Sequence, residues 1–247
     1  MGSIAPWNSN PLAAGFYTVP EAARLIEDGS TRRIYGWLRG YAHRASGPMI
    51  ERQFKPLVDG RDEVSFFDLM ELRLIERLRD QGVFPRTIRS AIAEARKIFE
   101  NEKPFATDRI LIKTDGKNVF VEEVLKKVAQ EQKDKRLWNL VTKQYEHYEL
   151  MERTLIKGVT FDPESHFART WVPRPDRFPR IIIDPRIAYG MPVTQSHVPT
   201  ETIYEIFKAE NDNVTAAADW FNIALNEAEM AVRFQKELIA RPEKIAA

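Results

Sequence analysis

The stretch from Ile181 to Phe234 constrains the fold more than any other part of the chain, because it contains the pattern of a complete small unit. Three consecutive isoleucines predict a short buried strand, and the turn signals Asp184-Pro185 and Gly190-Met191-Pro192 follow them. Three short helices are expected next, starting at Thr200, Val214 and Asn226. A unit of this size buries too little apolar surface to be stable alone. We therefore expect it to pack against the rest of the chain or against a second copy.

Several short motifs in this unit match a known module. They are Asp184-Pro185, Gly190-x-Pro192-Val193, the run from Val198 to Ile203, and the Ala-rich turn before Trp220. In this order and spacing they resemble the domain of unknown function 433 family, which comprises small helical modules common in bacterial antitoxins. The resemblance implies a role in a complex with a toxin.

The composition excludes several classes of chemistry. There is no cysteine, so disulfides, thiol catalysis and cysteine-based zinc sites are excluded. The histidines lack metal-ligand spacing, and no common nucleophile, zinc-protease or phosphate-loop motif occurs. We therefore expect no enzyme, no catalytic residue, no metal and no cofactor. No apolar run approaches the roughly 20 residues that span a bilayer, and no secretion signal is recognised, so a cytoplasmic protein is expected.

The net charge of +1 hides an asymmetry between the two ends of the chain. Residues 17–57 contain seven Arg or Lys residues and four acids, which gives a net charge of +3. Residues 200–240 contain three bases and eight acids, which gives a net charge of −5. A basic front end and an acidic tail predict different partners for the two ends.

The basic front end begins with two predicted helices. Thr18 and Glu21 form a capping-box pattern for a helix that Gly29 ends, and Ser30 can cap a second helix. One apolar stripe of the second helix is expected to be buried, and it consists of Ile34, Trp37, Leu38 and Tyr41. Two short helices joined by a tight turn, the second of them basic, are what a helix-turn-helix needs to place one helix in the major groove of DNA.

The polar side of that second helix carries the candidate DNA contacts. These residues are Thr31, Arg32, Arg33, Tyr35, Gly36, Arg39 and, beyond the helix, Arg44. Arginines at these places could contact phosphates or base edges. The alternative interpretation is an ordinary solvated helix face. DNA reading would also require a dimer, because half-sites one helical turn apart need two copies of the helix.

The following residues extend the N-terminal pattern. Residues 42–64 contain turn signals that suit a short hairpin wing, Ser65 and Asp68 form another capping box, and Pro85 starts a further helix. The whole order resembles the MerR-like winged helix-turn-helix, and the matching residues are Tyr17-Thr18, 21–25, 30–41, Phe67-Asp68-Leu69, Leu72, Leu78-Arg79 and Gly82. One departure is that Tyr35-Gly36-Trp37 stands where many MerR proteins have an arginine before two aromatic residues, so base contacts cannot be carried over.

The middle of the chain gives a mixed pattern. Two alternating runs, 109–113 and 118–121, flank Asp115-Gly116 and predict a β-hairpin. We expect a short helix over 122–129 and a longer helix within 138–155. The segment from Phe167 to Arg180 contains three prolines, which favour an extended backbone.

The Pro-rich segment holds the candidate contacts with a protein partner, because Arg and Trp are enriched among the residues that dominate interface energies. These candidates are Arg169, Trp171, Arg174, Arg177 and Arg180. The alternative is a linker whose aromatic residues pack into the core.

The sequence thus predicts a mainly α protein with small β hairpins, divided into four parts. They are a disordered N-terminus (1–15), a MerR-like winged helix-turn-helix DNA-binding domain (16–104), a connecting region with hairpin, helical and Pro/Arg-rich parts (105–180), and a small three-helix antitoxin module (181–240). In this order the modules resemble VapB-type antitoxins of type II toxin-antitoxin pairs. The resemblance implies a cognate PIN-domain ribonuclease toxin that the chain neutralises, operator double-stranded DNA that it binds for autorepression, and a homodimer or toxin-antitoxin hetero-oligomer.

Two different surfaces of the chain could inhibit the toxin. An arginine of residues 167–180 could compete for the carboxylate-rich metal site of the nuclease, or the acidic C-terminal module could bind a basic patch on it. Two other functions also stay open: a MerR-like transcriptional regulator whose C-terminal half senses a small molecule, and an interaction adaptor that binds no DNA.

Overall fold

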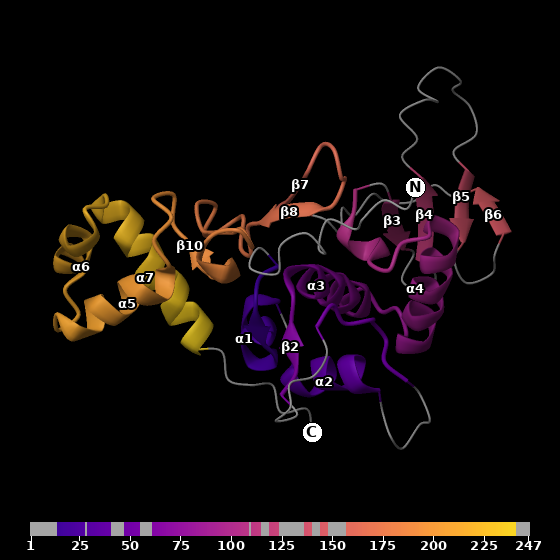
Figure 1. Ribbon diagram of the computed structural model, residues 1–247, viewed down its shortest axis with the longest axis horizontal. Coiled ribbons are helices and arrows are strands. Elements are labelled where there is room, and N and C mark those ends of the chain that lie inside the picture. Colours follow the sequence, from indigo (N-terminus) through magenta and orange to yellow (C-terminus); the bar gives the residue numbers. More distant parts are fainter. Residues whose placement is uncertain are drawn as a thin grey trace.

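The computed structural model describes residues 14–27, 29–40, 47–54, 61–108, 110–114, 119–123, 136–139, 144–147 and 157–240, with backbone alone for the four segments between 110 and 147. In this part the chain is mainly helical, with seven α-helices and small antiparallel sheets. The C-terminal helices lie at one end, the N-terminal helices in the middle and a small sheet at the other end (Figure 1).

The first two helices begin where the capping signals predict. Helix α1 (Val19–Leu25) has Thr18 as its N-cap, and Glu21 completes the capping box. Helix α2 (Thr31–Arg39) begins after Ser30, whose hydroxyl caps its first turn. The predicted apolar stripe of α2 is buried where it is described, at Ile34, Trp37 and Leu38, while Tyr41 lies outside the described residues.

The described residues do not show the expected hairpin wing. Residues 47–54 form no strand, and β2 (Glu63–Val64) pairs with β1 (Tyr17–Thr18) in a two-stranded antiparallel sheet. The turn signal Asp59-Gly60 lies outside the described residues. The observed strand pairing is long-range. It joins the residues just before α1 to residues 63–64, where a hairpin local in sequence was expected.

Helix α3 (Phe66–Asp80) is the centre of the N-terminal part. It begins at the predicted Ser65 capping box, and α4 (Pro85–Phe99) follows with its proline in the first turn. Five apolar residues along α3 are 0% exposed, namely Phe66, Leu69, Leu72, Ile75 and Leu78. Side chains of α1, α2, α3 and α4 share one hydrophobic core, so α3 is the support on which α1 and α2 are placed.

A buried ionic cluster anchors the chain after α4 to α3. Lys103 is 3% exposed and donates to the carboxylates of Asp68 and Glu71, which are both 0% exposed. Burial raises the pKa of Glu71, although Lys103 opposes this. Burial alone would lower the pKa of Lys103, but the two carboxylates outweigh it and raise that pKa. The short 3-10 helix η4 (Pro104–Ala106) follows directly.

A four-stranded antiparallel sheet occupies the described part of the middle region. Its strands, in the order β3-β4-β5-β6, are Ile110–Thr114, Val119–Glu123, Arg136–Asn139 and Gln144–His147. The hairpin predicted around Asp115-Gly116 is confirmed by the pairing of β3 with β4. The two helix predictions are wrong where the residues are described, because 122–123 lie in β4, and 138–139 and 144–147 lie in β5 and β6. The remaining residues of those predicted helices lie outside the described part.

A second antiparallel sheet leads into the C-terminal module. Its strands, in chain order, are β7 (Val159–Phe161), β8 (Ala168–Trp171), β9 (Ile182–Ile183) and β10 (Pro192–Val193), and they pair in the order β10-β9-β8-β7. Part of the Pro-rich segment is thus a strand. The predicted buried strand at the three isoleucines is confirmed, since Ile181 and Ile183 are 1% and 0% exposed.

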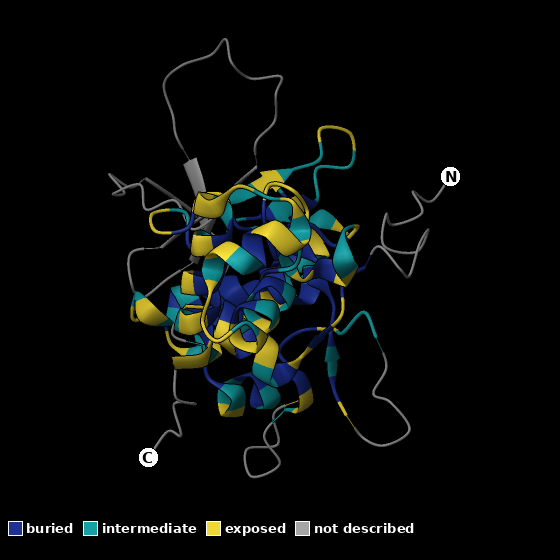
Figure 2. Cartoon of the chain, turned by 90° about the vertical axis from the view of Figure 1, so that its left-hand side faces the viewer, coloured by how far each residue is buried: buried dark blue, intermediate teal, exposed yellow. Residues whose placement is uncertain are grey.

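The three predicted C-terminal helices are confirmed, as α5 (Thr200–Ala209), α6 (Val214–Phe221) and α7 (Leu225–Ala240). The N-cap of α5 is Pro199, so Thr200 is not the cap; its hydroxyl instead accepts a hydrogen bond from Gln235 of α7 at 3.1 Å. Apolar side chains of the three helices form a small core of their own. Figure 2, viewed from this end, shows exposed residues on the outer faces and buried residues between the elements.

The C-terminal module packs on the rest of the chain, as its small size predicts. Phe234 of α7 is 0% exposed and belongs to the main core. Its ring meets the ring of Phe178 edge to face, with 5.4 Å between their centroids. Trp220 of α6 belongs to neither core and is 65% exposed.

A hydrogen bond joins the N-terminal strand to the loop before α5. Tyr17 Oη donates to Gly190 O at 2.8 Å in a buried position. Gly190 ends the 3-10 turn η5 (Ala188–Gly190) with φ +86°, and a Cβ at this residue would overlap the Tyr17 hydroxyl. Glycine is required here by both the backbone conformation and the close approach of Tyr17.

Tyr17→Phe tests this bond through the pH dependence of stability. Burial raises the pKa of Tyr17 above its ordinary value of 10.0, and Asp184 and Glu21 add to the effect. A raised folded pKa gives stability that is complete below the unfolded pKa and is lost as pH rises towards the folded pKa. We predict that Tyr17→Phe lowers the free energy of unfolding by about 1 kcal/mol at neutral pH. Between about pH 9 and pH 11, the free energy of unfolding of this variant should decline less than that of the wild type.

Urea denaturation across this pH range measures both effects. Tyr189→Phe is the matched control, because Tyr189 is 58% exposed and its loss should leave the wild-type profile unchanged. Parallel profiles for wild type and Tyr17→Phe would contradict the assigned role of the buried hydroxyl.

Candidate nucleic-acid and partner interfaces

Six of the seven predicted DNA contacts lie on α2, and Arg44 lies outside the described residues. Arg32 and Arg39 are exposed, on the side of α2 away from its buried stripe. Thr31, Arg33 and Tyr35 are partly buried. Gly36 is buried, so the structure gives it a packing position in α2 and not a place on the exposed face.

Two of the α2 arginines are held by buried acids. Arg33 forms an ion pair with Glu76 of α3, whose side chain is 1% exposed. Arg39 forms an ion pair with Asp62, whose side chain is 2% exposed, and its guanidinium lies 4.9 Å from the centroid of the Tyr35 ring. These contacts fix the direction of both side chains. The exposed face of α2 is therefore preorganised.

Sequence reasoning missed the acids that hold this face. Glu76 and Asp62 lie 43 and 23 positions from their arginine partners, so no local spacing connects them. Arg52 pairs with the same Asp62 and was missed for the same reason. No local signal marks them, because Asp62 lies outside the helices and Glu76 stands among other charged residues of α3. Once buried, each carboxylate requires a cationic or hydrogen-bonded partner.

The predicted partner contacts of residues 167–180 divide into two groups. Trp171 and Arg174 are each 2% exposed, so they cannot anchor a partner in this conformation. For these two residues the burial favours the alternative of a linker that packs into the core. Trp171 belongs to the main core, where the Arg73 guanidinium lies 5.5 Å from the centroid of its ring. The exposed candidates of the segment are Arg169, Arg177 and Arg180.

Arg174 joins the end of α1 to the C-terminal module. Its guanidinium donates to Leu25 O at 2.7 Å and to Arg24 O at 3.3 Å. These carbonyls belong to the last turn of α1, where a helix leaves acceptors without intrahelical partners and favours positive charge. Arg174 Nε lies 3.4 Å from the carboxylate of Glu237 in α7. Arg177 pairs with the same Glu237, so two arginines share this acid.

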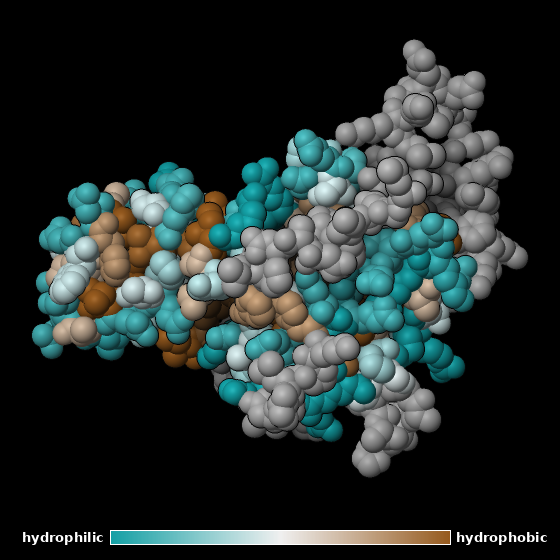
Figure 3. All heavy atoms as spheres, viewed as in Figure 1, coloured by the Kyte–Doolittle hydropathy of each residue, from teal (hydrophilic) through white to brown (hydrophobic). Residues whose placement is uncertain are grey.

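The C-terminal module presents an exposed aromatic residue beside acidic ones. Trp220 at the end of α6 is 65% exposed, and Leu225 at the start of α7 is 45% exposed. The Trp220 indole donates to Glu210 at 3.3 Å. Hydrophobic and hydrophilic residues are mixed on this end of the molecule (Figure 3). A tryptophan held on an acidic surface is a typical anchor for a protein partner.

Among the described residues, no cluster of three or more His, Asp or Glu side chains is placed to hold a metal ion. No helix in that part combines the length and the apolar character that a membrane crossing requires.

Replacing Arg174 should destabilise the fold strongly. Arg174→Ala leaves two carbonyls of α1 without this donor and removes a buried cation beside Glu237, so we predict a loss of about 2–4 kcal/mol of unfolding free energy. Arg180→Ala removes the same charge from an exposed position and should change stability by about 0.5 kcal/mol or less. Urea denaturation measures both, and equal effects would refute the structural role of Arg174.

Comparison with known proteins identifies a shared fold. The crystal structure of Rv2018 from Mycobacterium tuberculosis superposes with a TM-score of 0.58 at 16% sequence identity, covering 87% of this chain and 96% of that chain. At this identity the similarity concerns the fold and not the function. No protein-family model matches the chain. No curated protein matches it either.

Proposed function

We propose that this chain is an antitoxin, which binds operator DNA through α2 and neutralises a PIN-domain ribonuclease through its C-terminal module. The observation that carries the proposal is the separation of two charged surfaces. The N-terminal part presents the preorganised basic face of α2, and the C-terminal module is acidic and presents an exposed tryptophan. The two surfaces suit two partners of different charge. The resemblance of the module order to VapB-type antitoxins supplies the identity of these partners.

DNA binding by α2 rests on the position of its arginines. Arg32 and Arg39 are seven residues apart, so they occupy one face of the helix about 10 Å apart along its axis. Both are exposed, and the pairing of Arg39 with Asp62 fixes one of them. A basic face of this length suits contacts with phosphates along a groove. A homodimer would supply the second helix for the other half-site.

Toxin binding is proposed for the C-terminal module in preference to residues 167–180. Two of the five predicted contacts in that segment, Trp171 and Arg174, are buried. Trp220 offers an exposed aromatic anchor, and the net charge of −5 over residues 200–240 complements a basic surface on a nuclease.

A ligand-responsive transcriptional regulator is the second candidate. One observation favours it, a cavity of about 320 Å³ beside the end of α1. In that case α2 would still bind DNA, and the exposed tryptophan would have no nuclease partner.

Arg32→Ala should weaken binding to a duplex from the chain's own upstream region by about 1–2 kcal/mol, and should lower the salt slope by about one. Fluorescence anisotropy at several salt concentrations measures both quantities. Arg233→Ala is the matched control, because Arg233 is an exposed arginine on α7. A DNA affinity that is unchanged by both Arg32→Ala and added salt would rule out α2 as the DNA-binding helix.

Trp220→Ala should release the nuclease. Loss of a buried interface tryptophan commonly costs about 2 kcal/mol or more, which is roughly a 30-fold weaker complex. Phe84→Ala is the control, because Phe84 is 70% exposed at the start of α4. Binding is measured by calorimetry and inhibition by RNA cleavage. Full inhibition by Trp220→Ala, together with release by Arg180→Ala, would assign the interface to residues 167–180 instead.

A further inference from the structure

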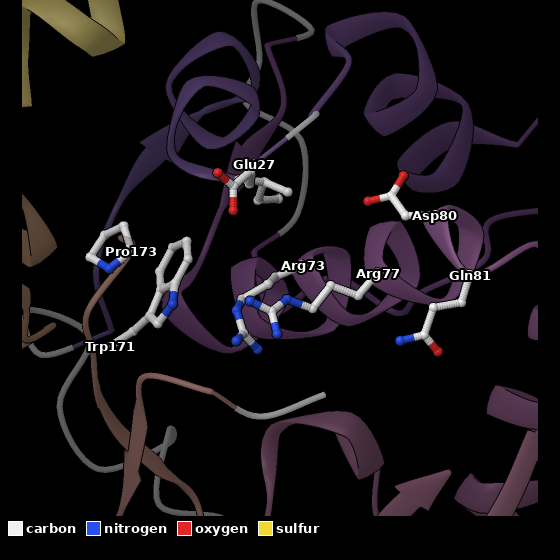
Figure 4. Close-up of a pocket in the computed structure, with 8 residues that line it drawn as sticks. Glu27, Arg73, Arg77, Asp80, Gln81, Trp171 and Pro173 are labelled. Carbon is white, nitrogen blue, oxygen red and sulfur yellow. The ribbon is translucent and has the colours of Figure 1, made fainter. Parts of the chain in front are cut away.

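A cavity of about 320 Å³ lies between the end of α1, the second half of α3 and the chain after β8 (Figure 4). One side of it is apolar, formed by Ile26, Trp171 and Pro173. The other side carries Arg73 and Arg77 of α3. Pockets for small ligands combine an apolar wall with a few converging polar groups, and this volume is at their lower limit.

The two arginines project into the same space. They are four residues apart on α3 and so lie on one face of the helix. Figure 4 shows both guanidinium groups between Trp171 and Gln81, below Glu27. Arg73 is 4% exposed and donates to Lys157 O at 2.6 Å, which holds its side chain in place.

The surroundings disfavour the charged form of both arginines. Burial lowers the pKa of Arg73 to about 9, and nearby Arg77 adds to the effect. Burial also lowers the pKa of Arg77, although Glu27 and Asp80 oppose it. An anion between the two guanidiniums would be attracted by both positive charges and would favour their charged form.

Two acids, Glu27 and Asp80, also line the cavity, and Glu27 is engaged on its other side. The Glu27 carboxylate lies 3.1 Å from the Arg177 guanidinium and 3.9 Å from Arg174 Nε. Its negative charge is therefore shared with two arginines that are outside the cavity lining. Asp80 lies on the side of Gln81, and both guanidinium groups lie on the side of Trp171 (Figure 4), so a ligand against Trp171 meets mainly the positive charges of Arg73 and Arg77.

We propose that this cavity binds a small organic anion. Its carboxylate or phosphate group is held by Arg73 and Arg77, and its apolar part lies against Trp171 and Ile26. Guanidinium groups suit both headgroups because their planar donors pair with two oxygens at once. This site is independent of the proposed DNA and nuclease contacts, and its test does not use either partner.

The location of the site gives it a consequence for the fold. Pro173 lines the cavity, and the next residue, Arg174, holds the last carbonyls of α1. A ligand that touches both α3 and Pro173 stabilises the junction between the N-terminal helices and the C-terminal module. Because it binds the folded state, it raises the unfolding midpoint, and the effect grows with the logarithm of ligand concentration above the dissociation constant.

Benzoate and phenyl phosphate are suitable probes, because they combine one anionic group with one apolar ring. Isothermal titration calorimetry at constant ionic strength should show one site for at least one of them. Benzamide, a neutral analogue of benzoate, should not bind. Arg77→Gln should weaken binding about tenfold or more, since a charge-assisted hydrogen bond is lost. Arg86→Gln, which removes the same charge from an exposed position on α4, should have no effect.

The outcomes separate the two headgroup classes. Binding of benzoate alone identifies a carboxylate ligand, and binding of phenyl phosphate alone identifies a phosphate ligand. No binding of either probe at about 10 mM, or equal binding by wild type and Arg77→Gln, overturns the proposal. If circular dichroism shows that Arg77→Gln is unfolded, Arg77→Lys replaces it, because it keeps the charge and loses the planar pair of donors.

Discussion

The burial of one guanidinium, that of Arg174, determines how the two functional ends of this chain are joined. Arg174 contacts the last turn of α1 and the acid Glu237 of α7 from a segment that is otherwise strand and turn. A buried cation is tolerated only with several acceptors, so the position of each element depends on the others. The edge-to-face contact of Phe234 with Phe178 holds the C-terminal module on the main core, and the same core places α2 on α3.

Local signals in the sequence predicted the helices well. Thr18, Ser30, Ser65 and Pro85 mark the starts of four helices because caps and proline act within one turn of the chain. The strands β5 and β6 were misjudged as helix, since their partners and not their spacing define them. The wing was expected from turn signals, whereas β2 pairs with β1 far away in sequence.

The candidate sites could also be predicted only where local sequence signals determine them. The polar face of α2 could be predicted from helical periodicity, but the buried acids Glu76 and Asp62 that orient its arginines could not. Residues 167–180 have a composition typical of a protein interface, but two of these residues, Trp171 and Arg174, are buried inside the fold. Burial depends on tertiary contacts, which a pattern of residue types along one segment does not encode.

We propose that this chain connects DNA and a ribonuclease, in line with the separation of charge between its two ends. The central proposal is a specific complex with a nuclease. The most direct measurement is co-expression with the product of the adjacent gene, purification through a tag on that product, and light scattering with an RNA-cleavage assay on the eluted material. A stable complex with silenced nuclease is the predicted result. Elution of this chain alone, beside an active or absent nuclease, would contradict the account.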